Sequence, residues 1–541
     1  MKANISYSAS GLTAKRSNRL FMAGLTTLAV VALCATSCRQ ESDEVLNYAY
    51  NDQMAFAAAE NSYAAKFDVF WHGMNTNYAL WDYEDKHGVD WDKVYDKYRP
   101  QFAALDSQQT AVTDAQLKAL LDSILAPLHD GHLLVTMKNH ATGKDVHSSP
   151  GALRIMRERQ EEYLAGMNRK LDESGFAYYR NAGEIIEMRH TNTSSRVTVV
   201  SHAMLTIQDL MVPLKTKDSL GTITPEERDT LQIYTDIVDQ ITKALASTLL
   251  GDNIKEAIET YNTLVYRYEY MHIPGLVPAD PKLTEYGLEA TYILFKGNIA
   301  YLTFDGFTFS AYLEPQLTQM LFGKVSEGTQ AVIDDLKATW QAWFDAIQTH
   351  QKAGDLGGVI IDVRSNGGGF LNDFKFLFGA LVPSGNFHDT NARFKRGTGR
   401  YDYSPIMPQY MPTYDGEHVT VTAPIVTLCN CGSVSMAEHT SYATKILENG
   451  TLIGTRTFGG FSALNSAETY TNNYAGYVGI MDVTPVFCYI PQEVAMTLDN
   501  EVLEGFGVTP DIEVTMDYDA WNSGAGPDSQ LEKALDYIKG K

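Results

Sequence analysis

The chain has 541 residues and a formal net charge of −23 at pH 7, with 44% hydrophobic and 20% charged residues. These values are ordinary for a soluble globular protein, and the length predicts two to four domains. The acidity argues against binding to nucleic acid or to anionic lipid surfaces, because both would repel the chain.

The first residues have the pattern of an export signal. Lys15, Arg16 and Arg19 precede an uncharged apolar run, Leu20 to Leu33, which is too short to span a membrane. Small residues then lead to Cys38, and this arrangement resembles a bacterial lipoprotein signal. The resemblance implies cleavage before Cys38 and attachment of lipid to that cysteine.

Removal of residues 1–37 as a lipoprotein signal peptide would take away four positive charges and no acid, so the net charge would fall from −23 to −27. We expect an exported lipoprotein of the cell envelope. Its lipid would anchor it in the outer membrane, facing the periplasm or the cell surface. An ordinary secretory signal peptide is the alternative.

Residues 38–140 have mainly helical periodicity. Apolar residues recur at three- and four-residue steps in two stretches, Phe67 to Met74 and Trp91 to Tyr98. Core packing explains these aromatic residues better than a ligand cage does. Asp90 is a candidate N-cap, and we expect Pro100 to end the helix that follows it.

Residues 141–285 have a less regular pattern, which we interpret as a mainly helical insertion of unassigned role. Pro150 to Leu171 has helical character. Thr224, Pro225 and Glu227 supply the N-cap, the first-turn proline and the capping-box acid of a further helix.

Residues 286–541 have the pattern of an α/β domain. Ile299–Phe304, Gly358–Val363 and Ile425–Leu428 are short apolar strands, and an amphipathic helix over Val332–Ile347 lies between the first two. Strands that alternate with helices predict a sheet buried on both faces.

Three cysteines follow Cys38, namely Cys429, Cys431 and Cys488. An odd number argues against a disulfide framework, and no Cys-x-x-Cys pair or His-rich cluster indicates a structural metal. We therefore expect buried thiols, no metal and no cofactor.

Ser435 is a candidate nucleophile. The segment from Cys431 to Glu438 follows an apolar strand and opens a helix. A serine at such a junction lies near free backbone N–H groups and the positive end of the helix dipole, which suits a nucleophile and its oxyanion. Helix capping is the structural alternative, and it is the commoner role of such a serine taken alone.

Two further segments carry candidate chemistry. Gly367, Gly368 and Gly369 allow the backbone to approach another segment closely. A phosphate-binding loop is one alternative, but the Lys-Ser/Thr of a P-loop is absent, and a simple turn is the other. His132 follows Gly131 and opens an apolar strand, so it is a candidate general base. A lone histidine is more often a structural residue.

Five motifs in chain order resemble those of the C-terminal-processing serine peptidases, and more closely their tricorn-core branch. The motifs are Leu-x-Asp-x-His, Asp-x-Arg-x-Asn-Gly-Gly-Gly, Ser-x-Ser-x-x-Glu, Ile-Gly-x-x-Thr-x-Gly and Gly-Val-x-Pro-Asp, at 128–132, 362–369, 433–438, 453–460 and 507–511. The resemblance implies a ClpP/crotonase-like β-spiral α/β core over 286–541, preceded by a helical domain that carries the base.

The resemblance also implies site residues. Ser435 would be the nucleophile, with Ser433 less favoured, and the N–H groups of Met436 and of Gly367 or Gly368 would form the oxyanion hole.

The base departs from the commoner pattern of the family. Much of the family uses a lysine just after Thr-x-Gly, but Gly460 stands at that position. The tricorn branch instead uses a histidine that a serine and a glutamate orient. His132 and Glu504 match the histidine and the glutamate, whereas Gly131 stands where the serine would be. A direct Ser-His-Glu relay and a relay through another hydroxyl both remain open.

The implied function is that of a serine endopeptidase which hydrolyses peptides or unfolded proteins through an acyl-enzyme. The alternative is a catalytically degraded peptide- or lipid-binding protein on the same scaffold, which the missing lysine favours. A structural surface lipoprotein would explain the anchor but not the five motifs. The sequence assigns no cleavage specificity and no oligomeric state.

Overall fold

The structure is a computed structural model. It describes residues 53–108, 111–167, 184–187, 211–248, 292–304, 306–307, 309–315, 327–397, 399–462, 477–479, 484–491, 493–523 and 526–541. The signal expected over 1–37 and the lipid site expected at Cys38 lie outside these ranges.

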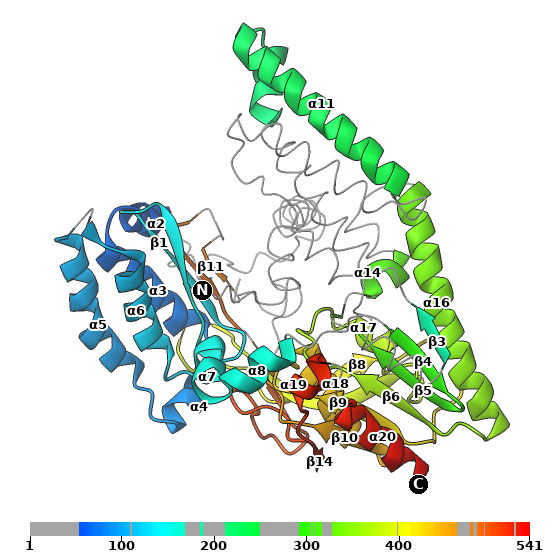
Figure 1. The fold of residues 1–541 in the computed structure, drawn as a ribbon. Helices are drawn as coiled ribbons and strands as arrows, with labels where there is room; N and C mark the ends of the chain where they lie inside the picture. Colours follow the sequence, from blue (N-terminus) through cyan, green and yellow to red (C-terminus); the bar gives the residue numbers. More distant parts are fainter. Residues whose placement is uncertain are drawn as a thin grey trace, which may run out of the picture.

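The N-terminal part is a bundle of helices around its own apolar core (Figure 1). Polar caps begin several of the helices; Ser62 Oγ, for example, accepts a hydrogen bond from the Ala65 N–H. The helices are α2 (Gln53–Ala59), α3 (Tyr63–Asn77), α4 (Trp81–Lys86), α5 (Trp91–Asp106) and α6 (Asp114–Leu125).

Helix α5 corrects one expectation, because it continues through Pro100 to Asp106. Proline removes one backbone hydrogen bond from the helix and disturbs the preceding turn. Phe102 and Leu105, however, are buried in the N-terminal core beyond it. Burial of two large apolar side chains outweighs that loss, so the helix does not end at the proline.

A four-stranded sheet adjoins these helices, in the order β11-β12-β1-β2. Strand β1 pairs antiparallel with both β2 and β12, so a late segment of the chain completes the N-terminal unit. The bounds are β1 Leu134–Asn139, β2 Lys144–Ser148, β11 Tyr477–Val478 and β12 Val486–Tyr489.

The core is a seven-stranded sheet, in the order β14-β10-β9-β6-β5-β4-β3. Neighbours from β14 to β5 run parallel, and β4 and β3 extend the sheet antiparallel. This arrangement confirms the expected α/β class. The bounds are β3 Glu184–Glu187, β4 Tyr292–Lys296, β5 Ile299–Thr303, β6 Gly358–Asp362, β9 Ile425–Cys429, β10 Gly450–Gly454 and β14 Ile512–Glu513.

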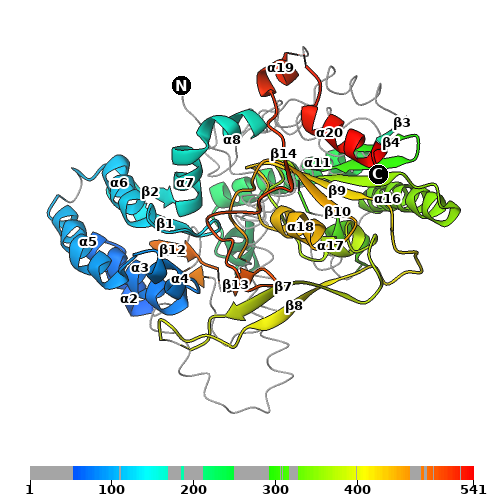
Figure 2. The ribbon, with the colours of Figure 1, turned by 90° about the horizontal axis from the view of Figure 1, so that it is seen from below.

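Helices cover both faces of this sheet, as its continuous apolar strands require (Figure 2). In β6, Val359 and Ile361 belong to one apolar cluster and Ile360 to the other. Helices α16 (Glu327–Ala353), α17 (Asp373–Phe376) and α18 (Met436–Lys445) contribute to the first cluster, and α19 (Tyr518–Asn522) and α20 (Ser529–Lys539) to the second.

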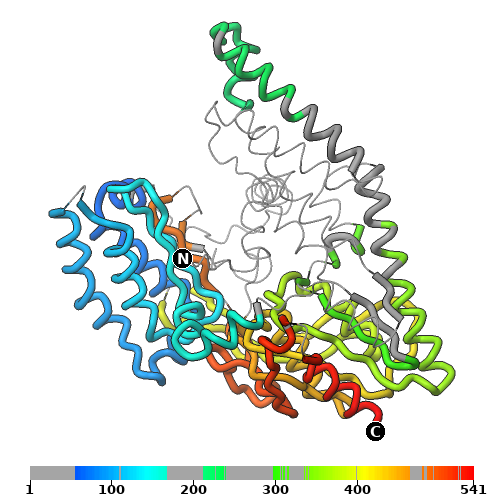
Figure 3. The backbone as a smooth tube through the Cα atoms, in the orientation of Figure 1, coloured from blue at the N-terminus to red at the C-terminus, as the bar shows by residue number. Residues whose placement is uncertain are grey.

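The remaining elements lie around these two units. Strands β7 (Asn386–Phe394), β8 (Met407–Pro412) and β13 (Glu493–Met496) form a small antiparallel sheet, and α14 is a single turn, Ser310–Leu313. Helices α7 (Pro150–Glu158), α8 (Gln160–Met167) and α11 (Pro225–Thr248) confirm the helical patterns expected there. Figure 3 shows α11 leading away from the end of α16.

The segment expected as an insertion also supplies β3 to the core sheet. The domain limits of 38–140, 141–285 and 286–541 stay a prediction. Cys429, Cys431 and Cys488 are buried, as expected, and their thiols are free in the part of the chain that the structure describes. Within the described ranges, no helix has the length and apolar character needed to cross a bilayer.

Candidate active site

Ser435 lies at a sharp turn between strand β9 and helix α18. Its φ is 59° and its ψ is −119°, a conformation that residues with a side chain rarely adopt. Strain of this kind costs on the order of 1–3 kcal/mol and persists only where the surroundings enforce it. An ordinary cap residue has an extended backbone, so capping alone does not explain Ser435.

The other serine of the motif, Ser433, has a structural role. Its buried hydroxyl donates to the Val363 carbonyl at 2.7 Å and accepts from the Asn430 N–H at 3.1 Å. These bonds fix the turn to the end of β6. Ser435, in contrast, is only half-buried. The preference for Ser435 over Ser433 as nucleophile therefore has a physical basis.

The glycine run after β6 packs directly against this turn. A Cβ added at Gly368 would lie 2.6 Å from Ser435 Cβ and 3.0 Å from the Met436 nitrogen, and its φ of 84° also favours glycine. The Gly368 N–H donates to Asn366 Oδ1 at 2.8 Å. Within the described residues the Gly367 N–H has no acceptor, and Met436 is the first residue of α18, where no intrahelical acceptor exists.

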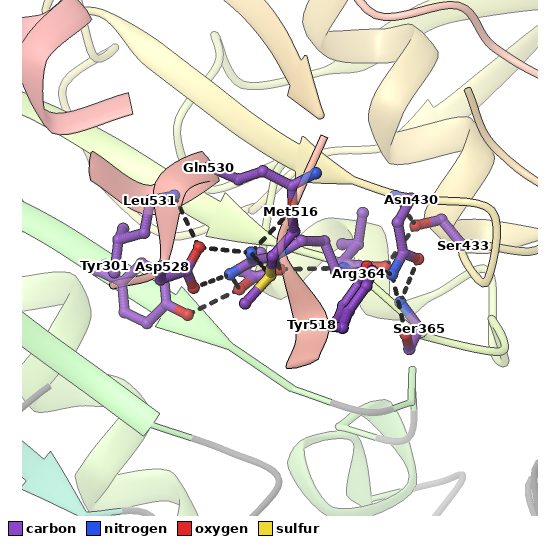
Figure 4. A network of polar contacts seen from close by, with 12 residues as sticks. Tyr301, Arg364, Ser365, Asn430, Ser433, Met516, Tyr518, Asp528, Gln530 and Leu531 are labelled. Atoms are coloured by element: carbon purple, nitrogen blue, oxygen red, sulfur yellow. Dashed lines mark hydrogen bonds and ion pairs between the residues drawn. The ribbon is translucent and has the colours of Figure 1, made fainter. Parts of the chain in front are cut away.

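A buried ion-pair network anchors the glycine run to the C-terminal helix (Figure 4). The Arg364 guanidinium binds Asp362 at 2.5 Å and Asp528 at 2.7 Å, with all three side chains buried. Burial disfavours the cation, but the two carboxylates raise the pKa of Arg364 well above its ordinary value. Asp528 also caps α20 by accepting from the Leu531 N–H at 3.0 Å. Helix α20 thereby holds the strand end from which the glycine run starts.

Glu438 connects the serine turn to the loop 457–460. Its buried carboxylate accepts from the Ser435 N–H at 3.3 Å, the Gly459 N–H at 2.8 Å and the Gly460 N–H at 2.6 Å. The Thr457 hydroxyl is a fourth donor, at 2.6 Å. Burial raises the pKa of Glu438 despite these donors. The acid of the Ser-x-Ser-x-x-Glu motif therefore holds two segments of the site together.

His132 enters the site from the N-terminal unit. Asp130 Oδ1 accepts from the N–H groups of His132 at 2.6 Å and Leu133 at 2.7 Å, which fixes the turn before β1. The His132 Nδ1 atom is buried and has no hydrogen-bond partner within the described residues. Burial, and then the charge of His439, lower the pKa of His132 to about 4. The imidazole is therefore neutral at neutral pH.

Gly460 marks the place where the histidine and the serine turn meet. A Cβ added there would lie 3.5 Å from His132 Cε1, 3.5 Å from Glu438 Oε2 and 3.2 Å from Val434 Cγ1. A lysine at this position would thus extend into space that the imidazole borders. Glycine at 460 and histidine at 132 are consistent as a pair.

Gly131 explains the departure from the tricorn pattern. A Cβ at this position would lie 2.4 Å from Gly460 Cα and 2.5 Å from the Gly459 carbonyl oxygen, both backbone atoms. A serine does not fit here without displacing the loop 457–460. A relay through a hydroxyl at residue 131 is therefore closed to this chain.

Glu504 is buried beside His132, but it binds backbone. One carboxylate oxygen accepts from the Gly131 N–H at 2.6 Å and the other from the Ser462 N–H at 2.5 Å. Burial, and then the charge of Asp130, raise the pKa of Glu504 well above its ordinary value. Glu504 thus fixes the segment that carries His132 without a hydrogen bond to the ring.

Four residues that shape the site have no role predicted from the sequence. Glu438, Asp130 and Arg364 stand inside the motifs, so their signal was present in the sequence. Arg154 of α7 had no such signal. Its guanidinium donates to the His129 carbonyl at 2.8 Å and to the Phe458 and Gly459 carbonyls at 3.2 Å. Within the ranges that the structure describes, no group of three acidic, histidine or cysteine side chains is placed to hold a metal ion.

Comparison with protein families matches two parts of the chain. Residues 298–514 match the model of peptidase family S41, and residues 59–109 match the tricorn protease C1 domain. These ranges contain Ser435, the glycine run and Glu504, whereas His132 lies between them.

Individual relatives match shorter stretches. The carboxy-terminal-processing protease of Bartonella bacilliformis is 27% identical over 186 residues, which are 34% of this chain and 36% of that protein. The tricorn protease of Thermoplasma volcanium is 26% identical over 181 residues, 34% of this chain and 14% of that protein. The match thus spans about a third or less of each relative.

Among solved structures, a photosystem II D1 C-terminal processing protease has a TM-score of 0.25 and 19% identity, covering 40% of this chain and 42% of that one. The family models confirm the resemblance to C-terminal-processing and tricorn-type peptidases. The chain carries a domain of peptidase family S41, preceded by a segment of the tricorn protease C1 type.

Proposed function

We propose that this chain is a serine peptidase that cleaves peptide bonds through an acyl-enzyme on Ser435, with His132 as the general base. The observation that carries the proposal is a convergence of three segments. Gly368 abuts Ser435, and the His132 ring and the Glu438 carboxylate border Gly460 from two sides. These are the parts that acyl transfer requires.

The reaction would proceed in two halves. His132, neutral at neutral pH, takes the Ser435 Oγ proton as the oxygen attacks the peptide carbonyl. The resulting imidazolium returns the proton to the leaving amine, and water then hydrolyses the ester with His132 again as base. Neither half needs a metal or an organic cofactor.

The oxyanion would be held by backbone N–H groups of Met436 and Gly367. Gly368 is the weaker candidate, because its N–H already donates to Asn366 Oδ1 at 2.8 Å. Removing one such donor typically costs about 3 kcal/mol of transition-state stabilisation. The role of Gly368 would be to lack a side chain where the loop meets Ser435.

Glu504 would act as a positioning residue. Its two oxygens hold the amides of Gly131 and Ser462, which fixes the peptide that leads into His132. This arrangement substitutes a backbone contact for the serine-mediated relay of the tricorn pattern.

A fluorophosphonate probe tests the proposal directly, because it labels an activated serine covalently. We expect labelling of the unmodified chain, loss of labelling in Ser435→Ala, and retained labelling in Ser433→Ala if that variant folds. Peptide hydrolysis should likewise be lost in Ser435→Ala and retained in Ser433→Ala. A chain that binds peptides but is neither labelled nor active would instead be a binding protein on this scaffold.

We also propose that Cys38 carries lipid and anchors the mature chain in the outer membrane. The support is the charged, apolar and small-residue order of the first 38 residues. Metabolic labelling with an alkyne fatty acid should be lost in Cys38→Ala and kept in Cys34→Ala. Labelling that survives Cys38→Ala would refute the anchor.

A further inference from the structure

His439 and Asp389 form a buried pair that the proposed mechanism does not use. His439 lies on α18, one turn after Ser435, and Asp389 lies on β7. The Nδ1 atom of His439 is 3.2 Å from Asp389 Oδ2, and its Nε2 atom is 3.1 Å from the Phe461 carbonyl oxygen. The side chains are 5% and 1% exposed, so water does not compete for these contacts.

The partners indicate that His439 is an imidazolium. A carbonyl oxygen only accepts hydrogen bonds, so Nε2 carries a proton, and an ionised carboxylate requires a proton on Nδ1 as well. Burial alone would lower the pKa of His439, but the hydrogen bond and charge of Asp389, with the charge of Glu493 on β13, raise it. The cation is thus stabilised by two acids from two strands.

This cation packs against the loop that also borders the His132 ring. The His439 ring stacks on the Phe461 ring, with centroids 4.6 Å apart and planes 11° apart. Phe461 directly follows Gly460, and a Cβ at Gly460 would be 3.5 Å from His132 Cε1. The two imidazoles therefore border consecutive residues of one loop, His132 at Gly460 and His439 at Phe461.

Three buried side chains hold successive residues of that loop. Glu438 accepts from the Gly459 and Gly460 N–H groups, His439 donates to the Phe461 carbonyl, and Glu504 accepts from the Ser462 N–H. Loss of the His439 contact would release the middle of this segment.

We infer that His439, held as a cation by Asp389, is a positioning residue that fixes loop 459–462 and keeps His132 unprotonated in mildly acidic solution. The catalytic consequence rests on the proposed function. The charged groups packed around His132 come from four elements. They are His439 and Glu438 from α18, Asp130 from its own turn, Glu504 from the late loop, and Arg154 from α7, which donates to the His129 and Gly459 carbonyls. The charge of His439 opposes a second positive charge on His132.

The inference is tested by histidine-selective NMR, which needs no activity. In the unmodified chain at pH 7, both ring nitrogens of His439 should have protonated shifts; a neutral tautomer would overturn the inference. The His132 titration midpoint should rise by roughly half a pH unit to one unit in His439→Gln. It should rise also in Asp389→Asn, which keeps the size of the side chain.

His350 supplies a matched control, because it pairs with Asp355 on the surface at 3.0 Å. His350→Gln should leave the His132 midpoint unchanged. If the midpoint is the same in His439→Gln, Asp389→Asn and the unmodified chain, the inference fails whether or not the chain hydrolyses peptides.

The pH profile of kcat/KM separates positioning from a structural role. In His439→Gln the acid limb should move to higher pH, so activity at pH 5 should fall relative to activity at pH 8. A merely structural contribution would lower the plateau without moving the limb. If the unmodified chain shows no hydrolysis, the proposed function fails, and the NMR result still decides the inference.

Discussion

The proposed site has two sides that are built in different ways. The nucleophile side carries Ser435 and the glycine run 367–369, and the base side carries His132. The nucleophile side comes from neighbouring parallel strands of one sheet, and its groups have close partners: Asn366, Ser433 and Arg364 are all buried and hydrogen-bonded. The base side comes from the N-terminal unit. There the His132 Nδ1 atom has no partner within the described residues, and the buried acids Asp130 and Glu504 have raised pKa values.

The two sides also differ in how the fold positions them. Adjacent parallel strands bring their carboxyl ends to one edge, so the serine turn and the glycine run meet through local topology. His132 reaches the same edge only through contacts such as that of Gly131 with Glu504, which are 373 residues apart in the chain. The unpartnered His132 Nδ1 atom lies on that side, where proton transfer is proposed, whereas the buried acid of raised pKa on the serine side, Glu438, is held by four donors.

The largest expected effect comes from removing the base. His132→Ala should lower kcat/KM by about 10²–10⁴-fold, the usual contribution of a general acid-base group. Peptide hydrolysis measured with a quenched fluorescent substrate checks this value. Lys445→Ala is the control, since Lys445 forms a surface ion pair with Asp511. An essential Lys445 with a dispensable His132 would restore a serine-lysine mechanism.

The next effect tests the nucleophile side. Gly368→Ala places a methyl group 2.6 Å from Ser435 Cβ, so it should displace the serine or the glycine run. We expect kcat to fall by about 10²-fold or more, as for loss of oxyanion contacts. Gly354→Ala has a similar positive φ of 75° with no atom within 4 Å of the added carbon, and should leave kcat unchanged. Equal losses in both variants would mean general destabilisation.

A smaller effect concerns the pH dependence of stability on the base side. Burial raises the pKa of Asp130 to about 7 in the folded chain. A raised carboxyl pKa means that its stabilising contribution is complete below the unfolded value of about 4 and is lost as pH rises through 7. Asp130→Asn should therefore flatten the decline in unfolding free energy between pH 4 and pH 8, by up to about 4 kcal/mol.

Chemical denaturation at several pH values checks this. Asparagine keeps the side-chain oxygen that accepts from His132 and Leu133, so activity should change little. Asp345→Asn on the exposed face of α16 is the control, and it should leave the pH dependence of the unfolding free energy unchanged. A steeper decline of the unfolding free energy with pH in Asp130→Asn would contradict the raised pKa of Asp130.

The fold around Ser435 is easier to predict from the sequence than the packing around His132, for the same physical reason. Apolar strands, a helix start and three glycines are local patterns. They predicted the α/β class, which is confirmed, and made Ser435 a candidate, whereas the role proposed for Met436 came from the family resemblance. The clash at Gly131, the tie between Glu504 and backbone amides, and the run of α5 through Pro100 depend on packing between distant segments. No local pattern carries that information, and Arg154 left no motif at all.

The smallest expected effect tests whether the position of His132 depends on the stability of the whole helical bundle. Thr113 caps α6, accepting from the Gln116 N–H at 3.2 Å while Gln116 Oε1 accepts from the Thr113 N–H at 2.8 Å. Thr113→Ala should cost about 1 kcal/mol of unfolding free energy. Because His132 is fixed by Asp130 and Glu504 and not by α6, kcat/KM at 25 °C should be unchanged. A fall in kcat/KM parallel to the loss of stability would show that the helical bundle itself sets the position of the imidazole. The base side would then include the whole N-terminal unit and not only the turn that carries His132.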